Sequence, residues 1–202
     1  MDWRHVRTGR LLLDEPVEDD AEALLAIHAD PVSWRHLPSG VVTDPAAGRT
    51  MVGASRQRFA RDALAYWSVR DRDAGPVVGR GGCALPDEAL DADVTGRGWW
   101  NLYYRFDQRV VGRGYATEMA AAALEAAHDV SPERPVLAYL LEHNVGSRRT
   151  AEKLGLRLVW RGPDDGNPDP SATRLVFLDR DPDDALVAAL AVEGMAPEGL
   201  VP

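Results

Sequence analysis

The sequence predicts a mixed α/β fold, and three observations support this prediction. Two alternating apolar segments, 65–70 and 76–85, flank a short polar turn, which is typical of a β-hairpin. Between residues 116 and 127, apolar side chains recur at the spacing of one helix face. The composition is that of an ordinary globular protein, because 45% of the 202 residues are hydrophobic and 27% are charged.

Apolar alternation, helical spacing and chain breakers define the elements of the first half. A helix from Pro16 ends at Asp30, before a proline, and Asp44 followed by Pro45 is a pattern that starts helices. In chain order we expect a strand at 10–13, a helix at 16–30, a helix after Pro45, and the hairpin with its turn at 71–75. A polar loop then leads to an aromatic strand at 99–106.

The second half alternates helices with short strands. Gly155 closes one helix, since glycine adopts the left-handed conformation that follows a last helical turn. The loop at 162–170 contains three prolines, which disfavour regular structure. We expect the Ala-rich helix from Tyr115, a strand at 135–141, a helix at 144–154, strands at 156–161 and 173–178, and a short helix at 183–192.

Composition and charge exclude several classes of protein. The formal net charge is −9, which argues against a nucleic-acid partner because such partners are held by clustered cations. Cys83 is the sole cysteine and the five histidines form no His-x-x-x-His pair, so we expect no disulfide and no metal site. The apolar run at 11–13 is too short for a signal peptide or a membrane span, so we expect a cytoplasmic protein without a membrane partner.

The segment at 109–118 joins the aromatic strand to the Ala-rich helix, and its chemistry favours anion binding. Gly112 and Gly114 have no side chains that would block a phosphate, and the first amides of a helix have no acceptors within it. The helix dipole adds partial positive charge, and Arg109 and Arg113 can add full charges.

Two familiar phosphate-binding patterns fit this segment poorly. The Lys-Ser/Thr ending of a P-loop is absent. A dinucleotide fold requires a third glycine where Thr117 stands, and Glu133 precedes the next strand instead of ending it. Taken alone, the segment also fits a glycine-rich turn that only joins a strand to a helix.

A second segment, 144–156, begins directly after the strand that follows the Ala-rich helix. The patterns Arg-x-x-Gly-x-Gly-Tyr-Ala from residue 109 and Asn-x-x-Ser-x-x-x-x-Glu-Lys-Leu-Gly-Leu from residue 144 together resemble the acetyl-CoA signature of the GCN5-related N-acetyltransferase (GNAT) superfamily. Residues 8–13 and 100–106 resemble its subgroup of ribosomal-protein N-terminal alanine acetyltransferases. The resemblance covers residues 8–178 and leaves the C-terminal tail unexplained.

The resemblance implies a central, mixed, mostly antiparallel sheet that is splayed in its middle and has helices on both faces. It implies one acetyltransferase domain at 1–180, with a tail at 181–202 that contains a short helix. The pantetheine arm of acetyl-CoA is expected in the splay, beside the backbone of the aromatic strand at 104–106. The residues expected to bind the cofactor are Phe106, Arg109, Val111, Gly112, Arg113, Gly114, Tyr115, Ala116, Thr117, Asn144 and Lys153.

The catalytic groups depart from the common family pattern. Many members carry a tyrosine as the acid seven residues after the asparagine, where this chain has Ala151. In the subgroup a serine at the position of Ser147 is proposed to protonate the departing thiolate, so Ser147 is the candidate acid. Ser147 also fits a purely structural role near Asn144. Glu142 and Tyr104 are candidates for the base, with Tyr103, His143 and a water relay as alternatives.

The implied reaction is direct transfer of an acetyl group from acetyl-CoA to a primary amine in a ternary complex, by a monomer or a homodimer. The amine is a peptide N-terminus or a small molecule. An acidic protein favours a cationic amine, although net charge alone does not locate a binding patch. A non-catalytic module that binds or senses acyl-CoA is the alternative from a different class of function.

Overall fold

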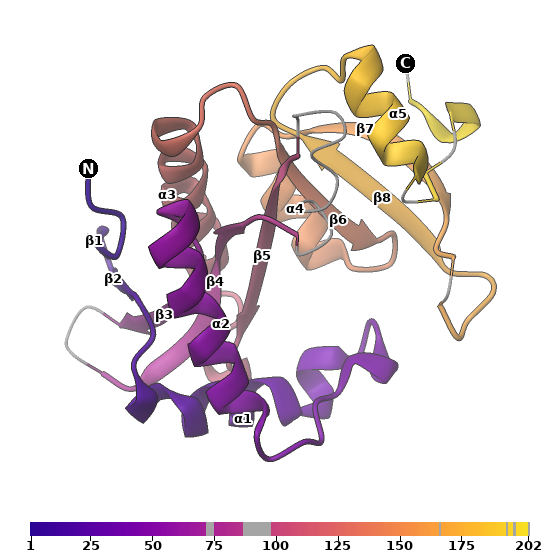
Figure 1. The fold of residues 1–202 in the computed structure, drawn as a ribbon. Helices are drawn as coiled ribbons and strands as arrows, with labels where there is room; N and C mark the ends of the chain where they lie inside the picture. Colours follow the sequence, from indigo (N-terminus) through magenta and orange to yellow (C-terminus); the bar gives the residue numbers. More distant parts are fainter. Residues whose placement is uncertain (72–74, 87–97, 166, 193, 196, 202) are drawn as a thin grey trace. The chain divides into compact units, whose positions relative to one another are not determined.

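The computed structural model describes residues 1–71, 75–86, 98–165, 167–192, 194–195 and 197–201 (Figure 1). These residues form two compact units. The first unit comprises Met1–Ala84 and Leu102–Pro132, and the second comprises Leu85–Asn101 and Glu133–Pro202. Most of the expected polar loop before the aromatic strand, and the middle of the turn expected at 71–75, lie outside the described residues.

The first unit consists of strands with helices packed against them. Strands β1 to β4 pair in sequence order, and each of these pairs is antiparallel. The strands are β1 His5–Arg7, β2 Leu11–Asp14, β3 Tyr66–Asp71, β4 Val77–Ala84 and the larger part of β5 Trp100–Phe106. The helices are α1 Ala21–Ala29, α2 Ala47–Asp62 and α3 Tyr115–Val130.

Helices cover both faces of these strands, because neighbouring residues of β4 point in opposite directions. A Cβ atom on Gly81 would lie 2.5 Å from the terminal methyl of Met119 in α3. The adjacent Arg80 donates instead to Ser55 of α2. Helix α3 therefore lies on one face, and α1 with α2 lies on the other. A Cβ atom on Gly81 would also lie 2.8 Å from the Tyr103 carbonyl oxygen. The close approach of β5 to β4 at this point therefore requires glycine.

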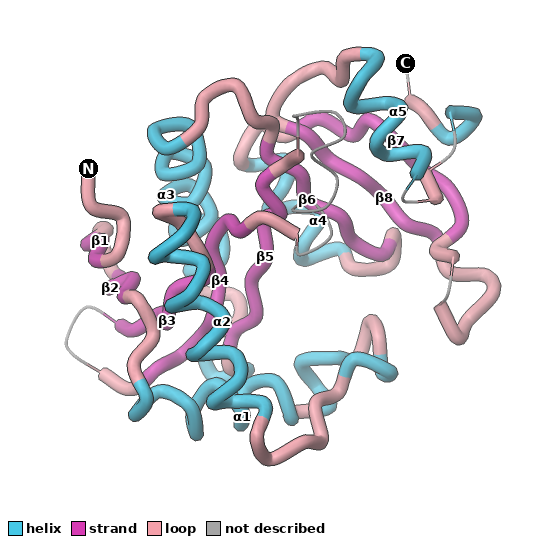
Figure 2. The backbone as a smooth tube through the Cα atoms, viewed as in Figure 1, coloured by secondary structure: helices cyan, strands magenta, loops and turns pink. Residues whose placement is uncertain are grey.

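The second unit contains the remaining strands. Trp100 and Asn101, the first residues of β5, pair in parallel with β6, and the order continues with β8 and then β7, both antiparallel to their neighbours. The elements are β6 Val136–Leu141, α4 Val145–Lys153, β7 Arg157–Pro163, β8 Thr173–Leu178 and α5 Asp184–Val192. Helix α5 lies over β7 and β8 (Figure 2). Its Leu186 and Leu190 belong to one buried apolar cluster with Trp160 of β7.

The predicted fold class is confirmed: eight strands, antiparallel in five of the six recorded pairings, combine with helices on both faces. Strand β1 was not expected. Strand β7 also runs further than expected, since Gly162 and Pro163 continue its pairing with Arg174 and Thr173 of β8. A proline fits there because it lies at the end of an edge strand, where its missing N–H interrupts no central ladder.

Candidate active site

The glycine-rich loop of the first unit connects β5 to α3. After a single 3-10 turn at Gln108–Val110, the backbone turns through Gly112 and Gly114, whose φ angles are +86° and +79°. Non-glycine residues rarely adopt these angles, which explains both glycines. A Cβ atom on Gly112 would meet no atom within 4 Å, so the space beside this residue is open.

Several backbone amides at the start of α3 have no hydrogen-bond acceptor. Within the loop, the amides of Val111 and Arg113 donate to the carbonyls of Gln108 and Val110. The first helical bond to cross this junction runs from Glu118 to Gly114, at 3.1 Å. In the described part of the chain, no acceptor is recorded for the amides of Gly112, Gly114, Tyr115, Ala116 and Thr117. Together with the helix dipole, these amides form a site suited to an anion.

The two arginines of the loop differ in their availability. Asp107 accepts hydrogen bonds from Nε and Nη2 of Arg109, and these bonds hold the pKa of the Asp107 carboxyl below its usual value. The Asp107 carboxylate therefore neutralises the charge of Arg109. Arg113 is exposed, and no partner of its guanidinium is recorded among the described residues. Arg113 is the loop residue whose full charge is available to a ligand.

Residues distant in sequence hold this loop in place. Arg10 donates from Nη1 to the Arg113 carbonyl at 2.6 Å and from Nε to the Glu118 carboxylate at 2.6 Å. Thr8 also donates to Glu118. Burial raises the pKa of Glu118, but the hydrogen bonds from Thr8 and Arg10 outweigh this effect and leave its pKa lowered. Arg10 and Glu118 were not predicted in this role, because no local spacing connects residues about a hundred positions apart.

Strand β5 presents Tyr103 and Tyr104 to opposite faces. A Cβ atom on Gly81 would point to Met119 of α3, and the Cβ atom of Tyr104 lies 2.8 Å from that position. Tyr104 therefore lies on the α3 face. Tyr103 lies on the other face, where its hydroxyl bonds to His28 of α1 at 3.1 Å. The two candidate tyrosines therefore lie on opposite faces of the strands of the first unit, Tyr104 on the α3 face and Tyr103 on the α1 face.

In the second unit, Asn144 and Ser147 form the start of α4. Asn144 is the N-cap, and its Oδ1 accepts a hydrogen bond from the Ser147 amide at 3.1 Å. Ser147 is half-buried, and its hydroxyl has no partner recorded among the described residues. The hydroxyl therefore lies in the first turn of a helix, where the dipole stabilises negative charge nearby. Lys153, at the other end of α4, is exposed.

Glu142 forms an ion pair that weakens it as a base. Arg161 donates from Nε to Oε1 at 2.9 Å and from Nη2 to Oε2 at 3.0 Å, which is the bidentate geometry of a strong pair. The hydrogen bond from Arg161 lowers the pKa of the Glu142 carboxyl. A carboxylate held in this way removes a proton from an amine less readily than the sequence suggested.

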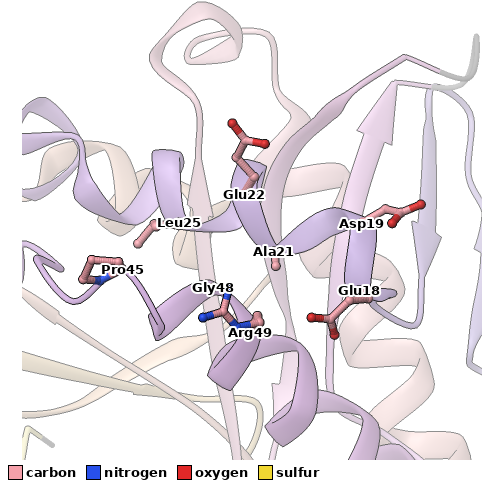
Figure 3. Close-up of a pocket in the computed structure, with 8 residues that line it drawn as sticks. All are labelled: Glu18, Asp19, Ala21, Glu22, Leu25, Pro45, Gly48 and Arg49. Atoms are coloured by element: carbon pink, nitrogen blue, oxygen red, sulfur yellow. The ribbon is translucent and has the colours of Figure 1, made fainter.

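A pocket of about 560 Å³ lies between α1 and α2 in the first unit (Figure 3). The residues that line it include three acidic residues, Glu18, Asp19 and Glu22, and one arginine, Arg49. The predicted site residues do not line it. Its acidic wall does not suit the pyrophosphate of a coenzyme.

The described residues contain neither a metal-binding cluster nor a membrane-spanning helix. Nowhere in these ranges do three or more His, Cys, Asp or Glu side chains gather in a way that could hold a metal ion. No helix within them is both long enough and apolar enough to cross a membrane.

Solved structures of acetyltransferases share this fold. A GNAT-family acetyltransferase from Bacillus anthracis is similar with a TM-score of 0.66 and 18% identity, over 86% of this chain and 96% of that chain. RimL, a ribosomal L7/L12 alpha-N-protein acetyltransferase in complex with coenzyme A, gives 0.69 and 13%, over 86% and 96%. A ribosomal-protein-S5-alanine acetyltransferase from Vibrio fischeri gives 0.65 and 10%, over 89% and 97%. No match was found among the curated proteins.

Fold and loop together define an acyltransferase with a helix N-terminus ready to receive an anion. The family model described as the acetyltransferase (GNAT) domain matches residues 10–157. The chain therefore belongs to the GNAT acetyltransferase family. The enzymes of this family take their acyl group from acetyl-CoA, and the free amides at the start of α3 fit the pyrophosphate of that molecule.

Proposed function

We propose that this protein is an N-acetyltransferase that moves the acetyl group of acetyl-CoA directly to a primary amine. The observation that carries this proposal is the row of free amides at the start of α3, beside the open space at Gly112. Direct transfer is favoured over an acetylated enzyme because Cys83, the sole cysteine, is fully buried in β4. A buried thiol cannot reach a thioester.

The loop would hold the coenzyme by its pyrophosphate. The amides of Gly112, Gly114 and residues 115–117 would donate to the phosphate oxygens, with Arg113 supplying charge. The resemblance adds three further contacts to this proposal: the backbone of β5 at 104–106 along the pantetheine arm, Asn144 as a hydrogen-bonding partner, and Lys153. When bound, acetyl-CoA supplies an activated thioester.

Ser147 is the proposed acid, and Tyr104 and Glu142 are the candidate bases. The Ser147 hydroxyl has no recorded competing partner, and it lies in the first helical turn of α4, where the dipole favours a developing thiolate. Glu142 stays a candidate base, weakened by its ion pair with Arg161. General acid–base groups contribute roughly a hundredfold or more, so positioning of the two substrates supplies the rest of the rate.

An amine panel tests the activity. It combines N-terminal peptides with small amines and measures the thiol of released CoA. Peptides of ribosomal type belong in it, because RimL and the Vibrio fischeri neighbour are ribosomal-protein acetyltransferases by their names. Turnover of at least one amine is expected, and tight binding of acetyl-CoA without acetylation of any amine would contradict the proposal. Cytoplasmic location and a monomeric or dimeric state stay predictions.

Replacement of Ser147 tests the acid. Ser147→Ala is expected to lower kcat about a hundredfold and to leave the KM for acetyl-CoA nearly unchanged, because only proton transfer is lost. Ser171→Ala is the matched control, since Ser171 is an exposed serine of the same unit. Equal turnover of the two variants would remove Ser147 from the mechanism.

A pair of glycine variants tests the coenzyme site separately. Gly112 and Gly155 both have positive φ angles, +86° and +76°, and a Cβ on either would meet no atom within 4 Å. Gly112→Val and Gly155→Val therefore impose similar backbone strain. Calorimetry is expected to show loss of CoA binding in Gly112→Val alone. If both variants bind CoA equally, the pyrophosphate does not lie beside Gly112.

A further inference from the structure

Arg80 of β4 is a buried cation without an anionic partner. Its side chain is 8% exposed, and Nη2 donates to the neutral hydroxyl of Ser55 at 3.2 Å. The guanidinium carbon lies 4.8 Å from the centroid of the Tyr66 ring. Nε is buried and has no hydrogen-bond partner. In the described ranges, no ion pair to a carboxylate is recorded for it. Buried charges are normally paired, because their desolvation is costly.

Arg105 of β5, like Arg80, is surrounded by neutral groups, and we refer to these two arginines with His28, Tyr66 and Tyr103 as the arginine cluster. Its Nε donates to the Tyr103 hydroxyl at 3.0 Å, Nη1 donates to the Ser33 carbonyl, and its guanidinium carbon lies 3.3 Å from the centroid of the Trp34 ring. No partner is recorded among the described residues for Nη2. Aromatic faces and carbonyls hold a guanidinium in place without cancelling its charge.

His28 and Tyr103 connect the two arginines. The Tyr103 hydroxyl accepts from Arg105 and bonds to His28, and the Tyr103 ring lies 5.3 Å from that of Tyr66, over which Arg80 is placed. Burial, together with the charges of Arg80 and Arg105, lowers the pKa of His28 to about 4. His28 is therefore neutral near pH 7 and adds no anion.

The arginine cluster lies on one face of the first unit. Tyr103 and Arg105 are two residues apart on β5 and so share a face, and Arg80 points to α2 on that face of β4. Arg58 of α2 adds its positive charge near Arg80. This face is opposite α3, whose N-terminus is the proposed coenzyme site. Positive charge thus accumulates at a second place in the same unit.

We propose that Arg80 and Arg105 form an acceptor subsite that binds the carboxylate of the amine substrate. This inference rests on the proposed function, since it assigns a chemical class to the amine that is acetylated. The unpartnered Nε of Arg80 and Nη2 of Arg105 donate to the carboxylate, and the rings of Tyr66 and Tyr103 exclude water from it. The substrate is therefore an amine that carries a carboxylate group, either a free amino acid or an acidic peptide.

Calorimetry with paired ligands, in the presence of CoA, tests this subsite without requiring turnover. β-Alanine is compared with β-alanine amide, and the C-terminally amidated peptide Ser-Asp-Ala is compared with Ser-Asn-Ala. The carboxylate member of one pair is expected to bind about tenfold or more tightly, as expected for hydrogen bonds to a charged group. The pair that shows the difference distinguishes a free amino acid from a peptide. Equal binding within both pairs, or no binding at all, overturns the subsite.

Two variants assign the effect to Arg80. Arg80→Met is expected to abolish the preference for the carboxylate, whereas Arg56→Gln, at an exposed arginine of α2, is expected to retain it. Retained CoA affinity shows that Arg80→Met is folded. A carboxylate preference that survives in Arg80→Met overturns the assignment. If the wild type prefers the carboxylate ligand but acetylates no amine of the panel, the proposed function fails and the subsite stands. If the wild type acetylates an amine but does not prefer the carboxylate ligand, the subsite fails and the proposed function stands.

Discussion

Replacement of His28 is expected to change how the stability of the protein depends on pH. His28 is 3% exposed, and its Nδ1 lies 2.8 Å from the Leu24 carbonyl oxygen. A carbonyl only accepts, so Nδ1 carries the hydrogen, and Nε2 of the neutral ring accepts from the Tyr103 hydroxyl. Protonation of Nε2 would require the Tyr103 hydroxyl to accept a second hydrogen bond besides that from Arg105, and it would add a positive charge close to Arg80 and Arg105. His28→Gln removes the titration and keeps a polar side chain.

The magnitude follows from the two pKa values. Burial lowers the pKa of His28 from 6.5 to about 4 in the folded protein, which corresponds to about 3 kcal/mol. Between these values the unfolded chain binds more protons than the folded chain, so stability rises with pH. The contribution is complete above pH 6.5 and is lost as the pH falls towards 4.

Urea denaturation from pH 4 to pH 7.5 measures this effect. The difference in unfolding free energy between wild type and His28→Gln is expected to shrink by about 3 kcal/mol as the pH falls through this window. Carboxylates that titrate in the same range occur in both proteins, so their effect cancels in the difference. A difference that does not vary with pH would refute the neutral, buried state of His28.

Three further predictions concern the loop, the tail and the base. Arg10→Met is expected to weaken CoA binding about fivefold in calorimetry, since it removes charged hydrogen bonds that hold the loop, and unchanged affinity would contradict this role. Leu190→Ala is expected to cost about 2 to 5 kcal/mol in urea denaturation, because Leu190 is 1% exposed; a negligible loss would show that α5 contributes nothing to the core. Glu142→Gln is expected to lower kcat/KM less than about tenfold, since Arg161 already holds the carboxylate, and a larger loss would identify Glu142 as the base.

Local sequence patterns predicted much of the fold and part of the candidate site. The Ala-rich helix, the aromatic strand and the asparagine-capped helix α4 lie close to their expected places, because each depends on spacing, propensity or a cap within a few residues. Strand β1 was missed because its three residues are largely exposed and show no apolar alternation. It forms through pairing with β2, which is a tertiary effect.

The contacts that shape the site could not be predicted from local patterns. Glu118 lies off the apolar face of the Ala-rich helix, yet it accepts hydrogen bonds from Thr8 and Arg10. Tyr115 donates to Asp71 at 2.5 Å. Arg80 stands in a strand of glycines and small apolar residues, where sequence gives no sign that its guanidinium is buried. Pairings between distant elements decide these environments, and local periodicity carries no information about them.

Net charge alone does not identify the ligands of this protein. A charge of −9 suggests a cationic amine, but at physiological salt, charges on the surface are screened beyond about 8 Å. Glu18, Asp19 and Glu22 line a pocket between α1 and α2, whereas the described residues of the first unit include amides without a recorded acceptor at α3 and, on the opposite face, the buried Arg80 and the half-buried Arg105. Amides and buried arginines act at contact distance in a low-dielectric environment. Both proposed sites therefore depend on local donors rather than on net charge, and both would receive anions in an acidic protein.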